Sequence, residues 1–260
     1  MTRWAAGIEY LGTGYGGWQA QKQVRSIQQE IEAALSRIAD HAVHVSCAGR
    51  TDAGVHAFQQ VVHFDTDAER SAYGWLLGCN SSLPPEISLR WLQPVSLDFH
   101  ARYGATARHY RYVIHNHRAR SAVLAHRAAW WPLRLDAQAM HDAAQALVGT
   151  HDFTAFRHSQ CQSPTPIRNL RHIAVFRQHD FIVMDICANA FLHHMVRNII
   201  GALSAVGLGR QPVPWIAQVL AGRDRAQAGL KAPPEGLYFV GPEYPAEFSL
   251  PSPQTPWFPG

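Results

Sequence analysis

Residues 47–57 read Cys47-Ala48-Gly49-Arg50-Thr51-Asp52-Ala53-Gly54-Val55-His56-Ala57. Apolar stretches with strand character flank this segment, His41–Ala48 before the loop and Phe58–Phe64 after it. Two glycines therefore bracket an arginine and an aspartate in a sharp connection between strands. Such a loop can expose Asp52 at the sheet surface on a rigid backbone. An ordinary turn, in which Asp52 caps neighbouring amides and Arg50 is solvated, is the alternative that the local chemistry leaves open.

Outward from this loop, the first part of the chain alternates strands and helices. Arg3–Tyr10 has the apolar alternation of a half-buried strand. Ser26 followed by Gln29 forms a capping box, so a helix is expected to begin there. The further elements predicted in this part are a helix over Glu69–Leu77 and a strand over Ile87–Leu92.

Similar ingredients recur after residue 104. The predicted strands are Thr106–His115, Asn169–Arg177, Phe181–Ile186 and Leu237–Val240. The predicted helices run from Asp136 to Gly149, from Asn189 to about Val206, and from Pro214 to Gly222. Strands outnumber βαβ crossovers, which favours an α+β fold with a largely antiparallel sheet, split into related halves over 1–104 and 105–260. The proline-rich tail from Tyr244 is expected to be an extended arm over the surface.

Composition excludes several classes of protein. The chain has 260 residues, of which 47% are hydrophobic and 16% charged, so it can bury a sizeable core and is not disordered. Met1–Tyr10 lacks the layout of a secretory signal, and the apolar stretch Ile199–Leu208 is too short to span a bilayer. The four cysteines form no CxxC pair. We therefore expect reduced thiols in a cytoplasmic protein that does not bind membranes.

Positive charge is concentrated in two acid-free stretches. Between Asp98 and Asp136 there is no acidic residue, and arginine occupies positions 102, 108, 111, 118, 120, 127 and 134. Between Asp152 and Asp180 the arginines are Arg157, Arg168, Arg171 and Arg177. This segregation favours a phosphate-binding surface and hence a nucleic-acid partner. A GC-rich genome would explain the preference for arginine over lysine, but not the local absence of acids.

Two motifs that suggest other chemistry do not fit their context. Gly12–Gly17 satisfies GxGxxG, but the next helix is expected only at Ser26, so a mobile glycine turn is favoured over a dinucleotide site. Among the 16 histidines there is no HExxH motif and no zinc-deaminase pattern. His193 and His194 are adjacent, and a helix would point them in different directions. We therefore expect most of the histidines to be surface residues or hydrogen-bonded core residues.

Two further constellations suggest RNA chemistry. On the strand Thr106–His115, alternation places Arg108, Tyr110 and Tyr112 on one face, where they could form a stacking platform for bases or simply reflect the strand preference of tyrosine. On the apolar helix expected after Asn189, the residues His193, Arg197, Gly201 and Ser204 would align. A buried arginine needs a partner, and Asp52 is the candidate that pairing would keep ionised.

Several motifs carry a family resemblance over nearly the whole chain, from about Ile8 to Tyr244. GRTDAGVHA, with the upstream GTGYGGWQ and VRSIQ and the downstream FHARY, ARHYRY, NAFLHHMVRN and EGLYFV, closely resembles the tRNA pseudouridine synthase A (TruA) family. The resemblance implies the pseudouridine synthase fold: two ferredoxin-like halves that share a mixed, mostly antiparallel sheet with a central cleft. It also implies a homodimer that isomerises uridines 38, 39 and 40 in the tRNA anticodon arm without metal or organic cofactor.

The resemblance also implies roles for individual residues. Asp52 matches the nucleophilic aspartate, Tyr110 the tyrosine that stacks on the target base, and Arg50 the arginine that assists base flipping. Arg197 matches the arginine paired with the aspartate, and Leu237 an apolar residue near the base. Segments that touch RNA match Phe99, His100, Ala101, Arg102 and Tyr103, and Gln160, Cys161, Gln162, Ser163 and Pro164, with Arg70 and Arg118 as phosphate contacts. His109 stands where the family often has a second arginine.

Two rival functions remain open at this stage. The first is a non-catalytic RNA-binding module in which the same arginines and tyrosines bind RNA and Asp52 is structural. The second is a nucleotide-dependent oxidoreductase built on the glycine turn. The sequence also leaves open whether Asp52 would attack C6 of the base or C1′ of the sugar.

Overall fold

The computed structural model describes residues 1–252, and the chain divides into two units. The first unit contains residues 1–106 and the segment that begins at Tyr238, and the second contains Ala107–Leu237. The predicted second half, 105–260, differs from this division. The reason is that strand β10 (Leu237–Glu243) pairs in parallel with strand β3 (His56–Thr66) of the first unit.

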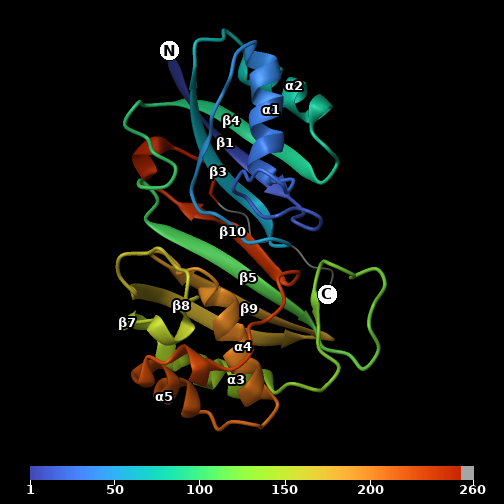
Figure 1. The fold of residues 1–260 in the computed structure, drawn as a ribbon, viewed down its shortest axis with the longest axis vertical. Coiled ribbons are helices and arrows are strands. Elements are labelled where there is room, and N and C mark those ends of the chain that lie inside the picture. Colours follow the sequence, from blue (N-terminus) through green and yellow to red (C-terminus); the bar gives the residue numbers. More distant parts are fainter. Residues whose placement is uncertain (253–260) are drawn as a thin grey trace. The chain divides into compact units, whose positions relative to one another are not determined.

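The first unit has the order β-α-β-β-α-β, which is that of a ferredoxin-like fold (Figure 1). Its strands are β1 (Thr2–Tyr10), β2 (Ser46–Cys47), β3 and β4 (Ile87–Val95), and its helices are α1 (Ile27–Ala39) and α2 (Ala72–Ser82). Strand β1 lies between β4 and β3, and β2 flanks β3, with every pair antiparallel. The helices α1 and α2 pack against each other, and α2 packs on β4.

Local signals fix where the helices of the first unit begin. The capping box at Ser26 forms as predicted, and α1 begins at the next residue. Helix α2 begins at Ala72 instead of Glu69, because the Ser71 hydroxyl accepts the backbone N–H of Gly74 at 3.0 Å. The strand predicted over His41–Ala48 shortens to Ser46–Cys47, which are the residues that pair with β3.

Strand β3 is covered on both faces. On one face Phe64 packs edge-on against Trp75 of α2, with ring centroids 5.6 Å apart. On the other face His63 lies against Phe99, and the Gln59 side chain donates to the carbonyl of Pro251 at 2.9 Å. Helices therefore cover one side of this sheet, and the residues after β4 together with the C-terminal segment cover the other.

Along the second unit the strands and helices follow the order β-β-α-β-β-β-α-α (Figure 1). Its strands are β5 (Ala107–His115), β6 (Ala129–Trp130), β7 (Gly149–Asp152), β8 (Ile167–Gln178) and β9 (Phe181–Ala188). Strand β9 lies between β5 and β8, and β7 flanks β8, all antiparallel, while β6 runs parallel to β5. The helices are α3 (Ala137–Ala144), α4 (Met195–Gly207) and α5 (Trp215–Gly222), which pack together. The predicted α+β class with a mostly antiparallel sheet is confirmed, and the first unit has the predicted ferredoxin-like order.

The prediction that a helix begins at Asn189 is wrong, because α4 begins at Met195. The Asn189 side chain accepts the backbone N–H groups of Ala190 and Asn169 at 2.9 and 3.0 Å, so it binds locally and to β8 and caps no helix. His194, directly before α4, has a left-handed backbone with φ of 63°. Residues 189–194 are therefore a loop.

The described part of the C-terminal tail lies on the first unit. The Tyr244 hydroxyl donates to the carbonyl of Ala101 at 2.6 Å, and the Phe248 ring packs against Phe99 at 5.1 Å. The rest of the predicted arm, residues 253–260, lies outside the described residues. Within residues 1–252, no helix has the length and hydropathy that a membrane span requires. None of the four cysteines, all of which lie within the described residues, forms a disulfide.

Candidate active site

The aspartate loop, residues 49–54, connects β2 to β3. Its ends are held by the sheet, because the Ala48 N–H donates to the carbonyl of Val61 at 2.8 Å. Within the loop, the Val55 N–H donates to the carbonyl of Asp52 at 3.2 Å, and Gly54 has a φ of 77°. The Asp52 side chain is half-buried. The loop is therefore a tight turn whose backbone fixes where the carboxylate points.

Neutral polar groups of neighbouring segments hydrogen-bond to this loop and hold it in place. Thr51 is buried, and its hydroxyl hydrogen-bonds the hydroxyl of Tyr10 on β1 at 2.7 Å. The carbonyl of Thr51 accepts the N–H of Trp18 at 3.0 Å, and Trp18 is buried. The Gln60 side chain donates to the carbonyl of Gly49. Buried bonds of this kind hold a loop rigidly, because breaking one exposes a polar group to the core.

The glycine turn 12–17 is part of the same support. Gly17 has a φ of 96°, and a Cβ there would lie 2.6 Å from the carbonyl oxygen of Thr51. The N–H of Gly12 donates to Nδ1 of His56 at 3.0 Å. Helix α1 begins ten residues after this turn, so the turn cannot place a helix N-terminus at a pyrophosphate. The structure thus gives the turn a packing role beneath the aspartate loop.

The cysteine beside the aspartate loop is not poised for nucleophilic chemistry. Burial raises the pKa of the Cys47 thiol to about 11, although the nearby Arg50 guanidinium acts in the opposite direction. Arg50 itself is exposed. At neutral pH the ionisable groups that this loop can offer a substrate are therefore the Asp52 carboxyl and the Arg50 guanidinium.

In the second unit, Tyr110 and Tyr112 share a face of β5 but differ in exposure. Tyr112 is fully buried, with its hydroxyl donating to the carbonyl of Pro233 at 2.8 Å, so it cannot belong to a stacking platform. Tyr110 is half-buried and meets the ring of Phe191 edge-on, with centroids 5.1 Å apart. The sequence did not indicate this contact, because its pattern assigned Phe191 to the apolar surface of a helix.

Arg197 is buried on α4, as expected for its position in an apolar helix. Its Nε donates to the carbonyl of Ala232 at 2.9 Å, and the Ala232 N–H donates back to the carbonyl of Arg197 at 3.1 Å. Gly201 and Ser204 are buried on the same helix, whereas His193 lies in the loop before it. The pairing of Arg197 with Asp52 stays a prediction.

The first predicted RNA segment, 99–103, presents only part of its side chains to solvent. Phe99 and Ala101 are fully buried, whereas Arg102 and Tyr103 are exposed. The Arg102 guanidinium lies over the Tyr103 ring at 5.6 Å from its centroid. A cation beside an exposed ring suits contacts to phosphate and to a base. Phe99 and Ala101 instead anchor the segment in the core.

The second predicted RNA segment, 160–164, belongs to the arginine-held loop, residues 157–165. Arg157 donates to the carbonyls of Cys161 and Ser163. Arg168 is buried and donates to the carbonyl of Thr165 at 2.9 Å and to the Ser163 hydroxyl at 2.6 Å. These arginines build the loop, so they are structural and not free phosphate ligands.

A thiol lies inside the arginine-held loop. Burial raises the pKa of the Cys161 thiol, but hydrogen bonds from the amides of Ser163 and His193 and the charge of Arg157 outweigh burial, and the net shift is downward. The His193 N–H donates to Cys161 Sγ at 3.4 Å. The contact joins this loop to residues 189–194.

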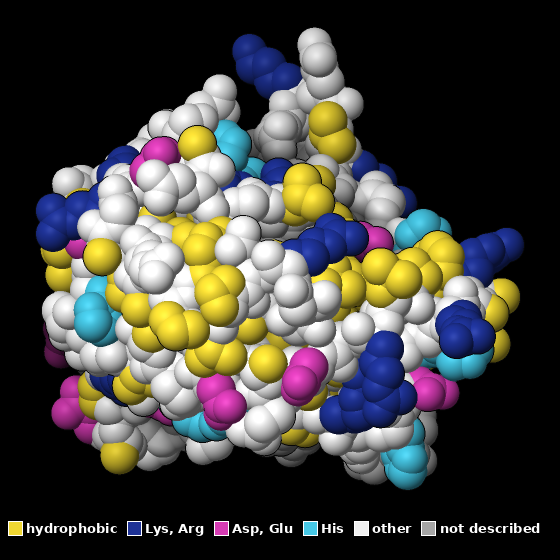
Figure 2. Space-filling view, turned by 90° about the horizontal axis from the view of Figure 1, so that it is seen from below, with side chains coloured by type: hydrophobic (Ala, Val, Ile, Leu, Met, Phe, Trp, Pro, Cys, Tyr) yellow, Lys and Arg dark blue, Asp and Glu magenta, His cyan; other side chains and the backbone are white. Residues whose placement is uncertain are grey.

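The arginine-rich stretches are only partly available for RNA. Arg111 makes a bidentate ion pair with Asp185 across β5 and β9, at 2.6 and 2.7 Å. Arg177 donates to Asn116 and to the carbonyl of Leu135. By contrast, Arg118 and Arg70 are exposed. Figure 2 shows one face on which Lys and Arg side chains are scattered between hydrophobic patches and form no single basic patch.

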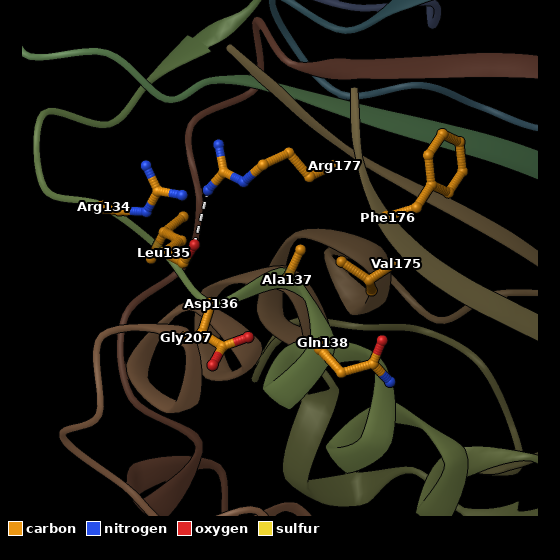
Figure 3. Close-up of a pocket in the computed structure, with 9 residues that line it drawn as sticks. All are labelled: Arg134, Leu135, Asp136, Ala137, Gln138, Val175, Phe176, Arg177 and Gly207. Atoms are coloured by element: carbon orange, nitrogen blue, oxygen red, sulfur yellow. Dashed lines mark hydrogen bonds between the residues drawn. The ribbon is translucent and has the colours of Figure 1, made fainter. Parts of the chain in front are cut away.

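One pocket lies away from the predicted site residues. It lies in the second unit. Two of the residues that line it are joined by a hydrogen bond, which the Arg177 guanidinium donates to the carbonyl of Leu135 (Figure 3). None of the residues that line it was predicted as a site residue. Leu237, predicted to lie near the base, is buried at the start of β10.

Comparison with known proteins identifies the family. The family model described as tRNA pseudouridine synthase matches residues 6–104 and 143–245, which is more than half of the chain. The chain therefore belongs to the tRNA pseudouridine synthase family. It is similar over nearly its whole length to proteins named tRNA pseudouridine synthase A.

Two of these relatives show how far the similarity extends. The Aeromonas hydrophila protein is 58% identical over 96% of this chain and 93% of its own length. The Cronobacter sakazakii protein is 56% identical over 96% of this chain and 92% of its own length. Among solved structures, the archaeal box H/ACA sRNP Nop10-Cbf5 complex matches at 13% identity over 78% of this chain and 43% of that chain, with a TM-score of 0.35. That last likeness is too low to add to the assignment.

Proposed function

We propose that this chain isomerises uridine to pseudouridine in tRNA, with Asp52 as the catalytic carboxylate. One observation supports this proposal above all. The chain belongs to the family, and its GRTDAGVHA segment folds as the aspartate loop, in which the Asp52 side chain is half-buried. Glycines and buried neutral groups hold that loop in one conformation. A fixed carboxylate suits a reaction in which the base must meet it in one orientation.

The reaction needs only groups that a protein can supply. The bond between C1′ and N1 of uridine breaks, and a new bond forms between C1′ and C5. The hydrogen on C5 leaves as a proton and N1 gains one, so there is no net oxidation, reduction or hydrolysis. A carboxylate can start this exchange by adding to C6 of the base or by attacking C1′ of the sugar, and both routes use Asp52 as the nucleophile.

The substrate part of the proposal is the tRNA anticodon arm, with uridines 38, 39 and 40 as targets and a homodimer as the active form. A target inside a stem must be flipped out of the stack, which costs a few kcal/mol. Stacking on Tyr110 supplies about 1–3 kcal/mol of this. The edge-on contact with Phe191 supports that role, since it restrains the Tyr110 ring. Arg50 is exposed beside Asp52 and suits insertion into the stem, and Arg197 assists the same carboxylate.

The rival functions differ in what they predict for the same loops. An oxidoreductase would need the glycine turn to open a helix, and the turn instead packs beneath the aspartate loop. A non-catalytic RNA-binding module would use Arg102 and Tyr103 in the same way as an enzyme does, but it would leave the uridine unchanged.

Tritium release from tRNA labelled at C5 of uridine tests the proposal, because isomerisation displaces that hydrogen. The purified chain is expected to release tritium from anticodon-arm uridines without an added nucleotide cofactor. Transcripts carrying uridine at 38, 39 or 40 alone locate the targets. Binding of tRNA without any release would establish the binding module and contradict the proposal.

A further inference from the structure

Three histidines of the second unit gather where two loops meet. His158 lies in the arginine-held loop, and His193 and His194 end the loop between β9 and α4. The loops are joined through the backbone, since the His158 N–H donates to the carbonyl of His193 at 3.1 Å. The contact between the His193 N–H and Cys161 Sγ is a second link. The three side chains therefore lie on two segments that two hydrogen bonds hold together.

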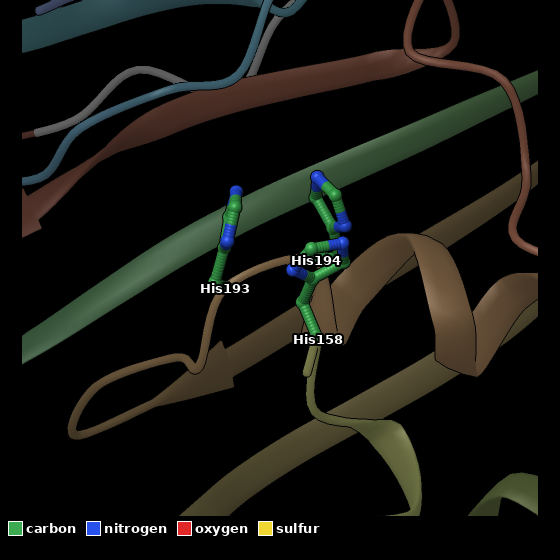
Figure 4. Close-up of side chains that lie close together, drawn as sticks. All are labelled: His158, His193 and His194. Carbon is green, nitrogen blue, oxygen red and sulfur yellow. The ribbon is translucent and has the colours of Figure 1, made fainter. Parts of the chain in front are cut away.

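The late start of α4 lets the two adjacent histidines converge. A helix would have pointed His193 and His194 apart, and that expectation is wrong because both precede the helix. The left-handed backbone of His194, with φ of 63°, is strained for a residue with a side chain. Their ring centroids lie 4.0 Å apart, and the His158 ring lies 4.9 and 4.4 Å from those of His193 and His194 (Figure 4).

One ring nitrogen from each histidine lies within 4.8 Å of the others. On a tetrahedral metal with bonds of about 2.05 Å, two nitrogen ligands lie about 3.3 Å apart, so small side-chain rotations would complete the set. His158 and His194 are half-buried while His193 is exposed, which leaves an entry path from solvent. The arrangement has the two properties that a metal site needs, convergence and access.

We propose that His158, His193 and His194 form a binding site for one transition-metal ion such as Zn²⁺. Imidazole nitrogens select Zn²⁺, Cu²⁺ and Ni²⁺ over Mg²⁺ and Ca²⁺, which prefer oxygen ligands. Three protein ligands leave a fourth position open to water or an anion. A bound ion would tie the arginine-held loop, with its predicted RNA segment 160–164, to the start of α4.

Binding has one structural cost that can be named. Nδ1 of His158 accepts the N–H of Gln160 at 3.2 Å, so in the neutral ring the proton is on Nε2. A metal at Nε2 requires that proton to move to Nδ1, and a metal at Nδ1 displaces the amide. Either way one long backbone contact is lost. Because neutral imidazole is the ligand, affinity must also fall as the pH is lowered.

Calorimetric titration of the untagged, chelator-treated full chain with Zn²⁺ alone tests the site. We expect one molar equivalent to bind, to raise the melting temperature, and to resist competition by excess Mg²⁺. His158→Gln and His193→Gln should each weaken Zn²⁺ binding at least tenfold. The matched control is His172→Gln, an exposed histidine on β8 outside the cluster, which should bind Zn²⁺ as the wild type does.

The outcomes distinguish this site from the catalytic proposal, since none of these readouts uses activity. No binding by the wild-type chain would overturn the proposal, whatever the variants do. Equal binding by the wild type and a folded His158→Gln/His193→Gln double variant would also overturn it, because the metal would then lie elsewhere.

Discussion

The aspartate loop and the arginine-held loop are both irregular segments fixed by side chains that bind backbone, but they use opposite chemistry. Neutral groups hold the aspartate loop, chiefly the Thr51 hydroxyl and the Gln60 amide. Guanidinium groups hold the other loop, through Arg157 and the buried Arg168. The difference teaches that side chains of either kind can fix an irregular loop. Neutral groups fix the loop that presents the Asp52 carboxylate, and guanidinium groups fix the loop that contains the predicted RNA segment 160–164.

The largest loss of stability is expected where the glycine turn meets the aspartate loop. Gly17→Ala forces a side chain into a left-handed backbone and places its Cβ 2.6 Å from the Thr51 carbonyl oxygen. Strain and overpacking together should cost about 3 kcal/mol of unfolding free energy. The shifted loop should also lower kcat on the order of 10²-fold. Urea unfolding and tritium release measure the two effects.

Gly14→Ala is the matched control for this substitution. Gly14 has a similar φ of 84°, but nothing lies within 4 Å of an added Cβ. Gly14→Ala should therefore lose only the stability that the strained backbone costs, about 1–2 kcal/mol, and its kcat should not change. Equal effects of the two substitutions would mean that the glycine turn does not support the aspartate loop.

A smaller and different effect is expected in the arginine-held loop. Arg168→Met keeps a long, unbranched side chain that can fill the same space, but it removes the hydrogen bonds that the guanidinium donates to Thr165 and Ser163. We expect a loss of about 1–3 kcal/mol in stability and a raised KM for tRNA with little change in kcat. The exposed Arg171→Met on the same strand is the control. A fall in kcat with unchanged KM would place this loop in the chemical step instead.

The last expected effect appears only in acid and concerns His63, which lies on β3 of the first unit outside both loops. Burial lowers the pKa of His63 to about 4, from an ordinary value near 6.5, with the charges of His100 and Arg3 acting in the same direction. Between these pH values the unfolded chain binds the extra proton, so stability is full above pH 6.5 and falls toward pH 4. At pH 5 the loss should be about 2 kcal/mol.

His63→Gln removes this titration while an amide oxygen can still accept the Ala101 N–H that His63 Nδ1 accepts at 3.2 Å. Unfolding free energies of both proteins at pH 7 and pH 5 make the comparison. The variant should lose about 2 kcal/mol less than the wild type over this interval. If both proteins lose the same amount, His63 does not titrate as its burial implies.

Much of the fold could be predicted because its signals are local. The capping box of Ser26 and the cap of Asp136 are visible in a few consecutive residues, and both begin helices as expected. The start of α4 could not be predicted, because Asn189 bonds to Asn169, which is distant in sequence. The two-residue strand β6 was missed because so short a segment has no periodicity to detect.

The sequence could name candidate site residues, but it could not show which groups support or cover them. Alternation placed Tyr110 and Tyr112 on one face, yet what covers Tyr112 is the segment around Pro233, far along the chain. The link between Tyr10 and Thr51 joins residues that no local pattern connects. The histidine cluster was missed for the same reason, because it depends on a backbone turn at His194.

The central claim is that the Asp52 carboxylate carries the chemistry, and Asp52→Asn tests it most directly because the amide keeps the size of the side chain but removes its charge and its nucleophilic oxygen. Tritium release from C5-labelled tRNA and tRNA binding are measured on the same preparation of the variant. We predict that release is abolished while tRNA affinity stays close to that of the wild type. Substantial turnover by Asp52→Asn would contradict the account.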